Sequence, residues 1–142
     1  MALEKNLLFK LLDYLENLIS QVESKEVTLN KLEEGMDFMF AVERRMQLMI
    51  ETTINIAEHI VAGLNLAHPE TAKDVFLVLG KEGIITQELA QKLANAAGFR
   101  NILVHDYLDV DLKIVAEAST TGLDDLRQFA TCIRQFIEKQ HN

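Results

Sequence analysis

Side chains with complementary chemistry lie close together in one short segment, where Arg100, His105 and Tyr107 form the pattern R-x4-H-x-Y. Arginine is a permanent cation whose planar donor fork fits a phosphate, and histidine exchanges a proton near neutral pH. Cleavage of RNA without a metal requires such groups. A base takes the proton of the ribose 2′-hydroxyl, an acid protonates the leaving 5′-oxygen, and a cation stabilises the charge on the phosphoryl oxygens. The segment is therefore a candidate catalytic site.

Helical geometry sets a condition on this site. Each residue of an ideal helix turns by ~100°, so Arg100 and His105 point ~140° apart, whereas Arg100 and Tyr107 are nearly eclipsed. The arginine and the histidine converge if the helix kinks or ends near His105, if their long side chains reach a common point, or if two copies of the chain face each other. The pattern also fits a protein in which both side chains only make structural hydrogen bonds, and this alternative stays open.

The elements around the segment are predicted to be helices, because apolar residues recur every three or four positions through most of the chain. The pattern predicts one all-α domain over residues 1–142, an antiparallel bundle of about five to six helices with one long second helix. That helix is expected to begin at a capping box formed by Asn30 and Glu33 and to run to about Leu64. The other helical patterns cover residues 2–22, 72–79 (closed by Gly80 and Gly83), 86–99 (capped by Thr86), 100–107, 112–118 and 123–137.

The long second helix is apolar on more than one side, and such a helix must be covered on more than one side. Five residues lie outside its main apolar stripe: Phe38, Phe40, Leu48, Ile50 and Ile54. In a chain this short, the extra cover is expected to come from a second subunit. The pattern therefore predicts a homodimer.

A strip of polar residues follows one face of the same helix. Its functional interpretation is that it lines the catalytic cleft and contacts Arg100 or the substrate. Its structural interpretation is a solvated face with pairs four residues apart. The strip consists of Arg44, Gln47, Glu51, Asn55 and Glu58, with Arg45 beside it, and we take Arg44, Arg45, Glu51 and Asn55 as candidates for lining the cleft.

The amino-acid composition excludes some classes of function. The chain has 14 Lys and Arg against 22 Asp and Glu, a net charge of −8, which argues against a general nucleic-acid binder but leaves room for a local basic pocket. The single cysteine, Cys132, excludes an intramolecular disulfide and a multi-cysteine zinc site, and we expect no metal and no cofactor. No apolar run approaches the ~20 residues of a membrane span, and the first residues do not form a secretory signal, so a cytoplasmic location is expected.

The sequence RNILVHDYLDVD, from Arg100, resembles the signature of the HepT-like toxin family within the HEPN superfamily. Residues 41–63 and 74–99 are similar to that family's long second helix and to the segment that leads into its motif. The resemblance implies a helical bundle that dimerises and brings two R-x4-H motifs into one cleft. It implies a metal-independent endoribonuclease that is the toxin of a toxin–antitoxin pair, with a minimal nucleotidyltransferase (MNT) as its antitoxin.

The resemblance also implies roles for individual residues. Arg100 would bind the phosphate and stabilise transition-state charge, His105 would act as general acid or base, and Asn101 would orient the site by hydrogen bonding. Tyr107 would receive AMP from the antitoxin and silence the toxin. Two other functions stay open: a non-catalytic binding module that is partner and substrate of the nucleotidyltransferase, and a structural helical dimer.

Overall fold

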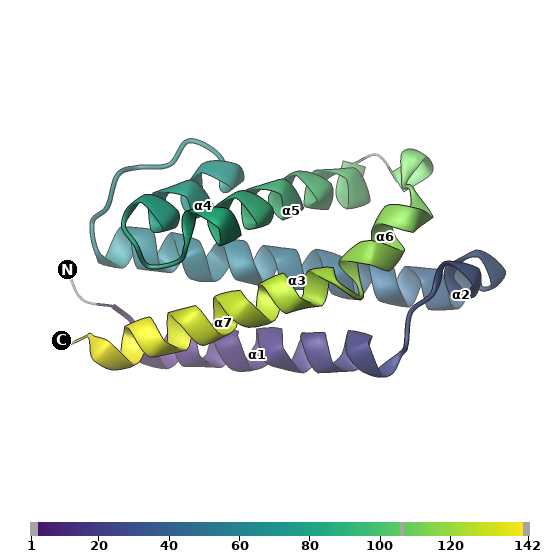
Figure 1. Ribbon diagram of the computed structural model, residues 1–142, viewed down its shortest axis with the longest axis horizontal. Coiled ribbons are helices and arrows are strands. Elements are labelled where there is room, and N and C mark those ends of the chain that lie inside the picture. The colour runs from purple at the N-terminus through teal and green to yellow at the C-terminus, as the bar shows by residue number, and fades with distance from the viewer. Residues whose placement is uncertain (1–2, 106, 141–142) are drawn as a thin grey trace.

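The computed structural model describes residues 3–105 and 107–140, and of Tyr107 it describes only the backbone. This part of the chain forms seven α-helices and one 3-10 helix, which confirms the predicted all-α class. The elements are α1 (Lys5–Ser24), α2 (Leu29–Glu34), α3 (Met36–Gly63), α4 (Ala72–Lys81), α5 (Gln87–His105), η1 (Tyr107–Asp109), α6 (Leu112–Ala118) and α7 (Gly122–Lys139). The long helices α1, α3, α5 and α7 alternate in direction, as Figure 1 shows.

The core forms because each long helix buries one apolar face. Leu8, Leu12 and Leu15 of α1 are fully buried, and Phe129 and Ile133 of α7 are fully buried as well. Burying one such side chain stabilises a fold by about 1.5–3 kcal/mol. The core reaches α4 through an edge-to-face contact between Phe76 and Phe129, whose ring centroids lie 6.0 Å apart. One hydrophobic core therefore joins the α4–α5 hairpin to the α1–α7 pair.

The predicted long second helix is divided into two. The short helix α2 begins after Thr28, whose hydroxyl oxygen accepts the backbone N–H of Lys31 at 3.2 Å. The backbone is then extended at Gly35 before α3 begins. Thr28, not Asn30, is thus the capping residue, so the predicted capping box is wrong. A threonine in extended backbone can accept an orphan N–H of the first turn, and glycine weakens helix continuation at Gly35.

Most of the extra apolar surface of α3 is covered by the chain itself. Ile50 and Ile54 are buried, with 3% and 7% of their surface exposed, because α4 and α5 pack on one side of α3 while α1 packs on the other. Phe38 and Leu48 are half-buried against the core, and Phe40 is 52% exposed. The apolar pattern of α3 therefore does not require a second subunit, and the homodimer stays a prediction.

The hairpin of α4 and α5 is held by a close helix–helix approach. Gly80 lies inside α4 rather than at its end, and a Cβ added there would stand 2.7 Å from Cβ of Ala90. Thr86 caps α5 as predicted, since its hydroxyl oxygen accepts the N–H of Leu89 at 3.1 Å. The two patterns predicted for 86–99 and 100–107 form one continuous helix that ends at His105.

Candidate functional site

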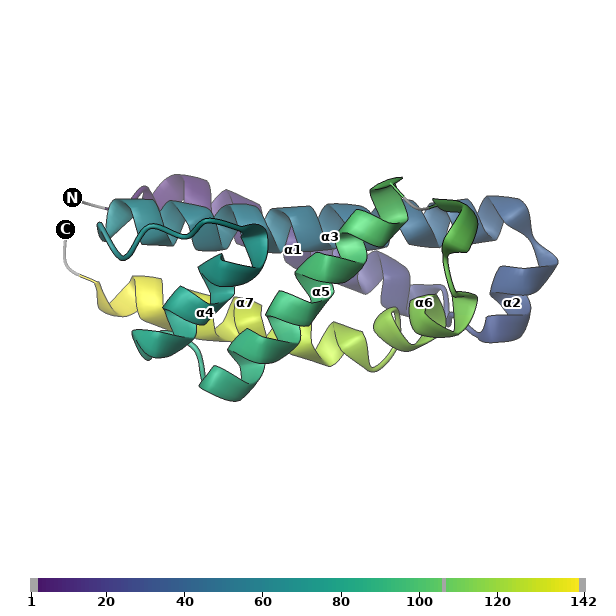
Figure 2. The ribbon, with the colours of Figure 1, turned by 90° about the horizontal axis from the view of Figure 1, so that it is seen from above.

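The residues of the R-x4-H pattern occupy the last turns of α5. Figure 2 shows α5 crossing over α3 obliquely, so that the C-terminal end of α5 reaches the far edge of α3. Leu93, Ala94 and Ala97 are buried before that point, whereas Asn101 and His105 are exposed. The fold therefore presents one side of this end of α5 at the surface, while Phe99 and Leu103 on its other side pack against the core.

Arg100 is held against α3. Its Nε atom lies 3.5 Å from Oε1 of Glu51, and the same carboxylate oxygen accepts a hydrogen bond from Nε2 of Gln47 at 3.1 Å. Nε itself is buried and makes no hydrogen bond of good geometry, while Nη1 donates to Oδ1 of Asn101 at 3.2 Å. With 34% of its side chain exposed, Arg100 is fixed on one side and open to a ligand on the other.

His105 is the last residue of α5 and is exposed. Because α5 is one helix from Arg100 to His105, the ~140° between them holds within one subunit. No hydrogen bond links the two side chains in the described part of the chain. Arg100 and His105 can therefore contact the same phosphate in two ways. Their long side chains extend toward it, or a second subunit supplies one of the two residues.

Asn101 and Tyr107 are the other two predicted residues of this segment. Asn101 is exposed, and its amide oxygen accepts the hydrogen bond from Arg100, so it lies where an orienting residue would lie. Tyr107 begins the 3-10 helix η1, two residues after His105, but its side chain lies outside the described part of the structure.

The polar strip of α3 is brought to the site only in part. Glu51 contacts Arg100, and its bond with Gln47 is the four-residue pairing of the structural interpretation. Arg44 and Asn55 are exposed, and no hydrogen bond or ion pair is found for either within the described residues.

Arg45 contacts α1 and not the R-x4-H segment, and its place in the catalytic cleft stays a prediction. Its Nε donates to Oε1 of Gln21 on α1 at 2.9 Å, and its Nη1 donates to the backbone oxygen of Ala41 at 3.2 Å. Position 45 faces α1, on the other side of α3 from α5. Adjacent residues of a helix point ~100° apart, so Arg44 and Arg45 leave α3 in different directions.

Sequence reasoning missed Glu43, which lies one helical turn before Gln47 on α3. Burial raises the pKa of its carboxyl group above the ordinary value of 4.5. Acidic residues on helices are usually solvated, and the spacing of Glu43 alone gave no signal that it is half-buried.

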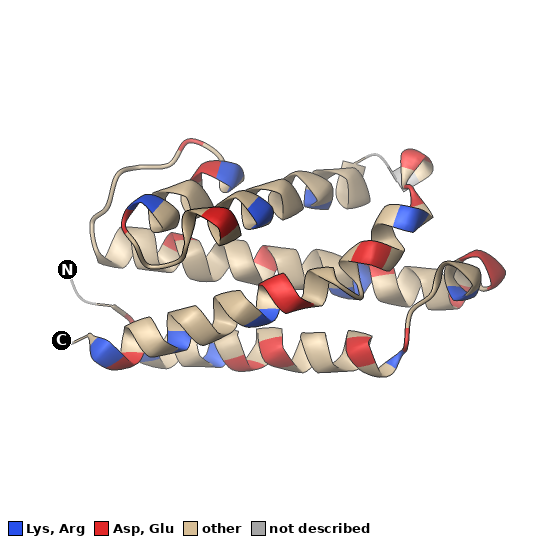
Figure 3. Ribbon diagram, in the orientation of Figure 1, with Lys and Arg blue, Asp and Glu red and all other residues tan. Residues whose placement is uncertain are grey.

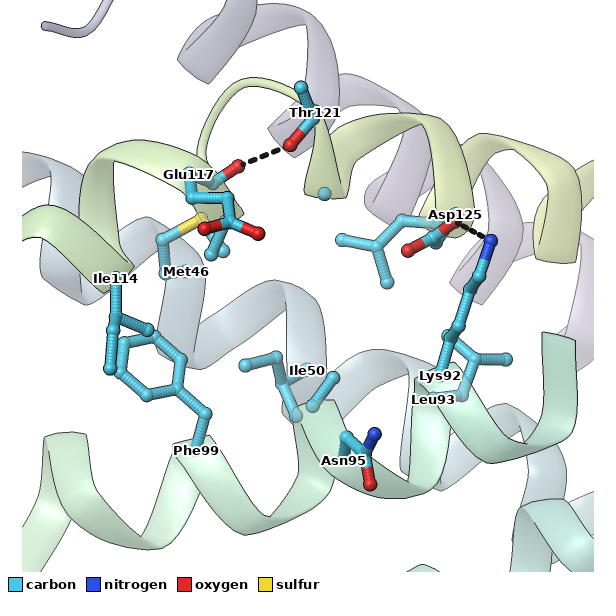
Figure 4. A pocket seen from close by; sticks show the side chains of 14 residues that line it. Met46, Ile50, Lys92, Leu93, Asn95, Phe99, Ile114, Glu117, Thr121 and Asp125 are labelled. Atoms are coloured by element: carbon cyan, nitrogen blue, oxygen red, sulfur yellow. Dashed lines mark hydrogen bonds and ion pairs between the residues drawn. The ribbon is translucent and has the colours of Figure 1, made fainter. Parts of the chain in front are cut away.

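A pocket of about 550 Å³ also escaped the sequence analysis. It lies between α3, α5, α6 and α7, and Figure 4 shows its largely apolar wall, which includes Met46, Ile50 and Phe99. At its rim, Lys92 and Asp125 form an ion pair of 3.8 Å. Neither Arg100 nor His105 lines it, so it is separate from the candidate catalytic segment.

Two further findings concern the described residues. No group of three or more His, Cys, Asp or Glu is placed there to hold a metal ion. None of the helices described is both long enough and apolar enough to cross a membrane.

Comparison with known proteins identifies the family of the chain. A family model described as HepT-like ribonuclease matches residues 11–133. The chain belongs to the HepT-like ribonuclease family. The match spans α3, α5 and the R-x4-H segment, and it confirms the resemblance that this segment indicated.

Individual HepT-like relatives agree with the family match. The mRNA nuclease HepT of Shewanella oneidensis is 37% identical over 89 residues, which cover 63% of this chain and 67% of that protein. The tRNA nuclease HepT of Aphanizomenon flos-aquae is 32% identical over 111 residues, which cover 78% of this chain and 74% of the relative. Among solved structures, the tri-AMPylated HEPN toxin of Shewanella oneidensis in complex with an MNT antitoxin is 27% identical. It superposes with a TM-score of 0.84 over 90% of this chain and 96% of that chain.

Proposed function

We propose that this HepT-like protein is the RNA-cleaving toxin of a toxin–antitoxin pair and a metal-independent endoribonuclease. The observation that carries the proposal is an exposed histidine, His105, five residues after an arginine that is half-buried yet open to a ligand, Arg100. The family match and two relatives that are named as RNA nucleases support it.

The chemistry follows from the two side chains. The neutral imidazole of His105 takes the proton of a ribose 2′-hydroxyl, and the 2′-oxygen attacks the adjacent phosphorus. The bond from phosphorus to the 5′-oxygen breaks, and the leaving oxygen takes a proton from an acid such as an imidazolium. Arg100 donates hydrogen bonds to the phosphoryl oxygens and stabilises the negative charge that gathers on them.

A homodimer would complete this site. One histidine cannot be base and acid in the same step, and within one subunit Arg100 and His105 point ~140° apart. A second subunit that faces the exposed end of α5 would supply the other imidazole and would place one subunit's arginine near its partner's histidine. The half-exposed Phe40 of α3 offers apolar surface for such a contact.

The proposed antitoxin is an MNT nucleotidyltransferase that transfers AMP from ATP to Tyr107. The tyrosine oxygen would form a bond to the α-phosphorus, and pyrophosphate would leave. The support is the structural likeness to a HEPN toxin that is tri-AMPylated and bound to an MNT antitoxin. We place this system in the cytoplasm, because the RNA substrate, the antitoxin and ATP meet there.

The test is cleavage of RNA by the purified protein in the presence of a metal chelator. The wild type is expected to cleave, and His105→Ala is expected to lower the rate by roughly 10²–10⁴-fold, the usual contribution of general acid–base catalysis. Because His105 is exposed, the variant should melt at the wild-type temperature. His59→Ala provides a control histidine on α3. Unchanged cleavage by His105→Ala would overturn the catalytic assignment.

A second function, the non-catalytic partner of a nucleotidyltransferase, is favoured by the net charge of −8 and by the carboxylate that already contacts Arg100. Under this alternative the protein binds and is modified by the transferase but leaves RNA intact. Expression of the chain without its antitoxin separates the two functions, since only a toxin would stop growth and degrade RNA.

A further inference from the structure

Lys73, in the first turn of α4, lies across the surface of α5 at Gly98. An ideal Cβ added to Gly98 would stand 3.1 Å from Cε and 3.3 Å from Nζ of Lys73. The missing side chain of Gly98 therefore leaves the space in which the lysine side chain rests on α5. This places an ammonium group on the helix that carries the R-x4-H pattern, only two residues before Arg100.

The lysine and the histidine share one face of α5. Gly98 and His105 are seven residues apart, so they differ by only about 20° around the helix and by roughly 10 Å along its axis. Asn101 lies between them along the helix and is exposed, as is His105. The surface from Lys73 past Asn101 to His105 is thus a short track with a cation at one end and an imidazole at the other.

The position of Lys73 is not explained by stability. A cation in the first turn of a helix is disfavoured by the helix dipole, and Lys73 is exposed. No hydrogen bond or ion pair involving Lys73 is found in the part of the chain that the structure describes. Its ammonium group is therefore free to bind an anion.

Charge is distributed so that this hairpin differs from the rest of the chain. Residues 72–105 contain four Lys and Arg against three Asp and Glu, whereas the whole chain contains 14 against 22. Figure 3 shows Lys and Arg interspersed with Asp and Glu on α4 and α5. Because acidic groups do not outnumber basic groups in this hairpin, it repels an RNA strand less than the rest of the protein does.

We propose that Lys73 binds an RNA phosphate that neighbours the scissile one. This proposal rests on the proposed function and adds a substrate-binding residue outside the family signature. A strand whose reacting phosphate lies at His105 and that runs along the exposed face of α5 brings a nearby phosphate to Lys73. The contact is to the backbone, so it strengthens binding of every RNA sequence alike.

The test measures binding of a labelled 2′-O-methyl RNA oligonucleotide, which lacks the attacking hydroxyl, across a series of salt concentrations. Lys73→Gln is expected to weaken binding several-fold and to lower the slope of log affinity against log salt by about 0.7–1, the value for one phosphate contact. Lys81→Gln removes the same charge from the other end of α4 and is the matched control. With cleavable RNA, Lys73→Gln should raise KM and leave kcat unchanged.

Gly98→Ala is a second variant that keeps the charge. The added methyl group displaces the flexible end of Lys73, so binding should weaken although the net charge is unchanged. Equal salt slopes for wild type, Lys73→Gln and Lys81→Gln would overturn the role of Lys73 while leaving cleavage and the proposed function intact. A wild-type protein that neither binds nor cleaves RNA would overturn both.

Discussion

Oε1 of Glu51 on α3 lies 3.5 Å from Nε of Arg100 on α5. This ion pair joins the two helices at the centre of the candidate site. Both side chains are about one-third exposed, and ion pairs of this kind contribute only roughly 0–1 kcal/mol to stability. The contact is therefore better understood as a means of fixing the direction of the guanidinium group than as a source of stability. Gln47, which donates to the same oxygen, fixes the carboxylate in turn.

The first prediction is that Glu51→Gln lowers kcat for RNA cleavage by roughly ten- to a hundredfold, because a small misplacement of a catalytic group has effects of this size. KM should stay unchanged or fall, because the variant removes a negative charge beside the phosphate site. Steady-state kinetics with Glu58→Gln as control measure this. Glu58 is exposed, lies on the same helix and loses the same charge. An equal loss of kcat in both variants, or no loss in either, would show that Glu51 does not position Arg100.

The second prediction concerns the addition of AMP to Tyr107. Incubation of the wild type with a cognate nucleotidyltransferase, Mg²⁺ and ATP should add AMP to the protein and reduce RNA cleavage. The added anion would stand two residues from His105, where it blocks the cleft and repels the RNA backbone. Intact-mass measurement should show the addition for the wild type and for Tyr14→Phe, which changes the only other tyrosine of the chain, but not for Tyr107→Phe. AMP found on Tyr107→Phe would place the acceptor elsewhere.

The third prediction is a pH dependence that arises at Glu43. Burial raises the pKa of its carboxyl group in the folded state above 4.5, so the folded state holds this proton to higher pH than the unfolded state does. Stability linked to this group is therefore lost as the pH rises through the raised pKa. Glu43→Gln should melt at a higher temperature than the wild type at about pH 7.5, and the difference should shrink at about pH 4. Thermal melts that differ equally at both pH values would contradict the assignment to burial of the charged form.

The fourth prediction concerns the approach of α4 and α5. Gly80→Ala adds a methyl group 2.7 Å from Cβ of Ala90. Overpacking costs about 1–3 kcal/mol, whereas the better helix propensity of alanine offsets about 1 kcal/mol, so a net loss of up to ~2 kcal/mol and a fall in Tm of several degrees are expected.

Two further variants test that explanation. Gly122→Ala should melt like the wild type, because its nearest neighbouring atom would lie 3.6 Å away. Adding Ala90→Gly to Gly80→Ala should recover part of the lost stability, since the two positions are in direct contact. A double variant that is as unstable as the sum of both single variants would exclude a clash between these two residues.

Much of the fold could be predicted because helical periodicity and capping are local properties of the sequence. The helix at 112–118 was predicted with the bounds that the structure has, and Thr86 was predicted as a cap. The break at Gly35 was missed, because the apolar pattern continues through it and the competing cap at Thr28 lies outside that pattern.

Only the part of the site that lies within one segment of the sequence could be predicted. Arg100 and His105 were found by type and spacing, and a helix end near His105 was one of the arrangements considered, but the exposure of this end was not predicted. Contacts between elements require the tertiary arrangement. The helical period does not show that Arg45 faces α1, that Glu43 is half-buried, or that Lys73 rests on Gly98.

The end of α5 leaves only one side exposed, where the side chains of Asn101 and His105 lie, and this side is where control of the protein can act. Asn101 and His105 lie on the exposed side of these last turns, so a binding partner can mask them by lying over them, without opening or refolding the bundle. Inhibition would then be fast and reversible, since only surface groups have to be covered or released. For the same reason, the exposed side chains on these turns can be exchanged with little risk to the rest of the domain.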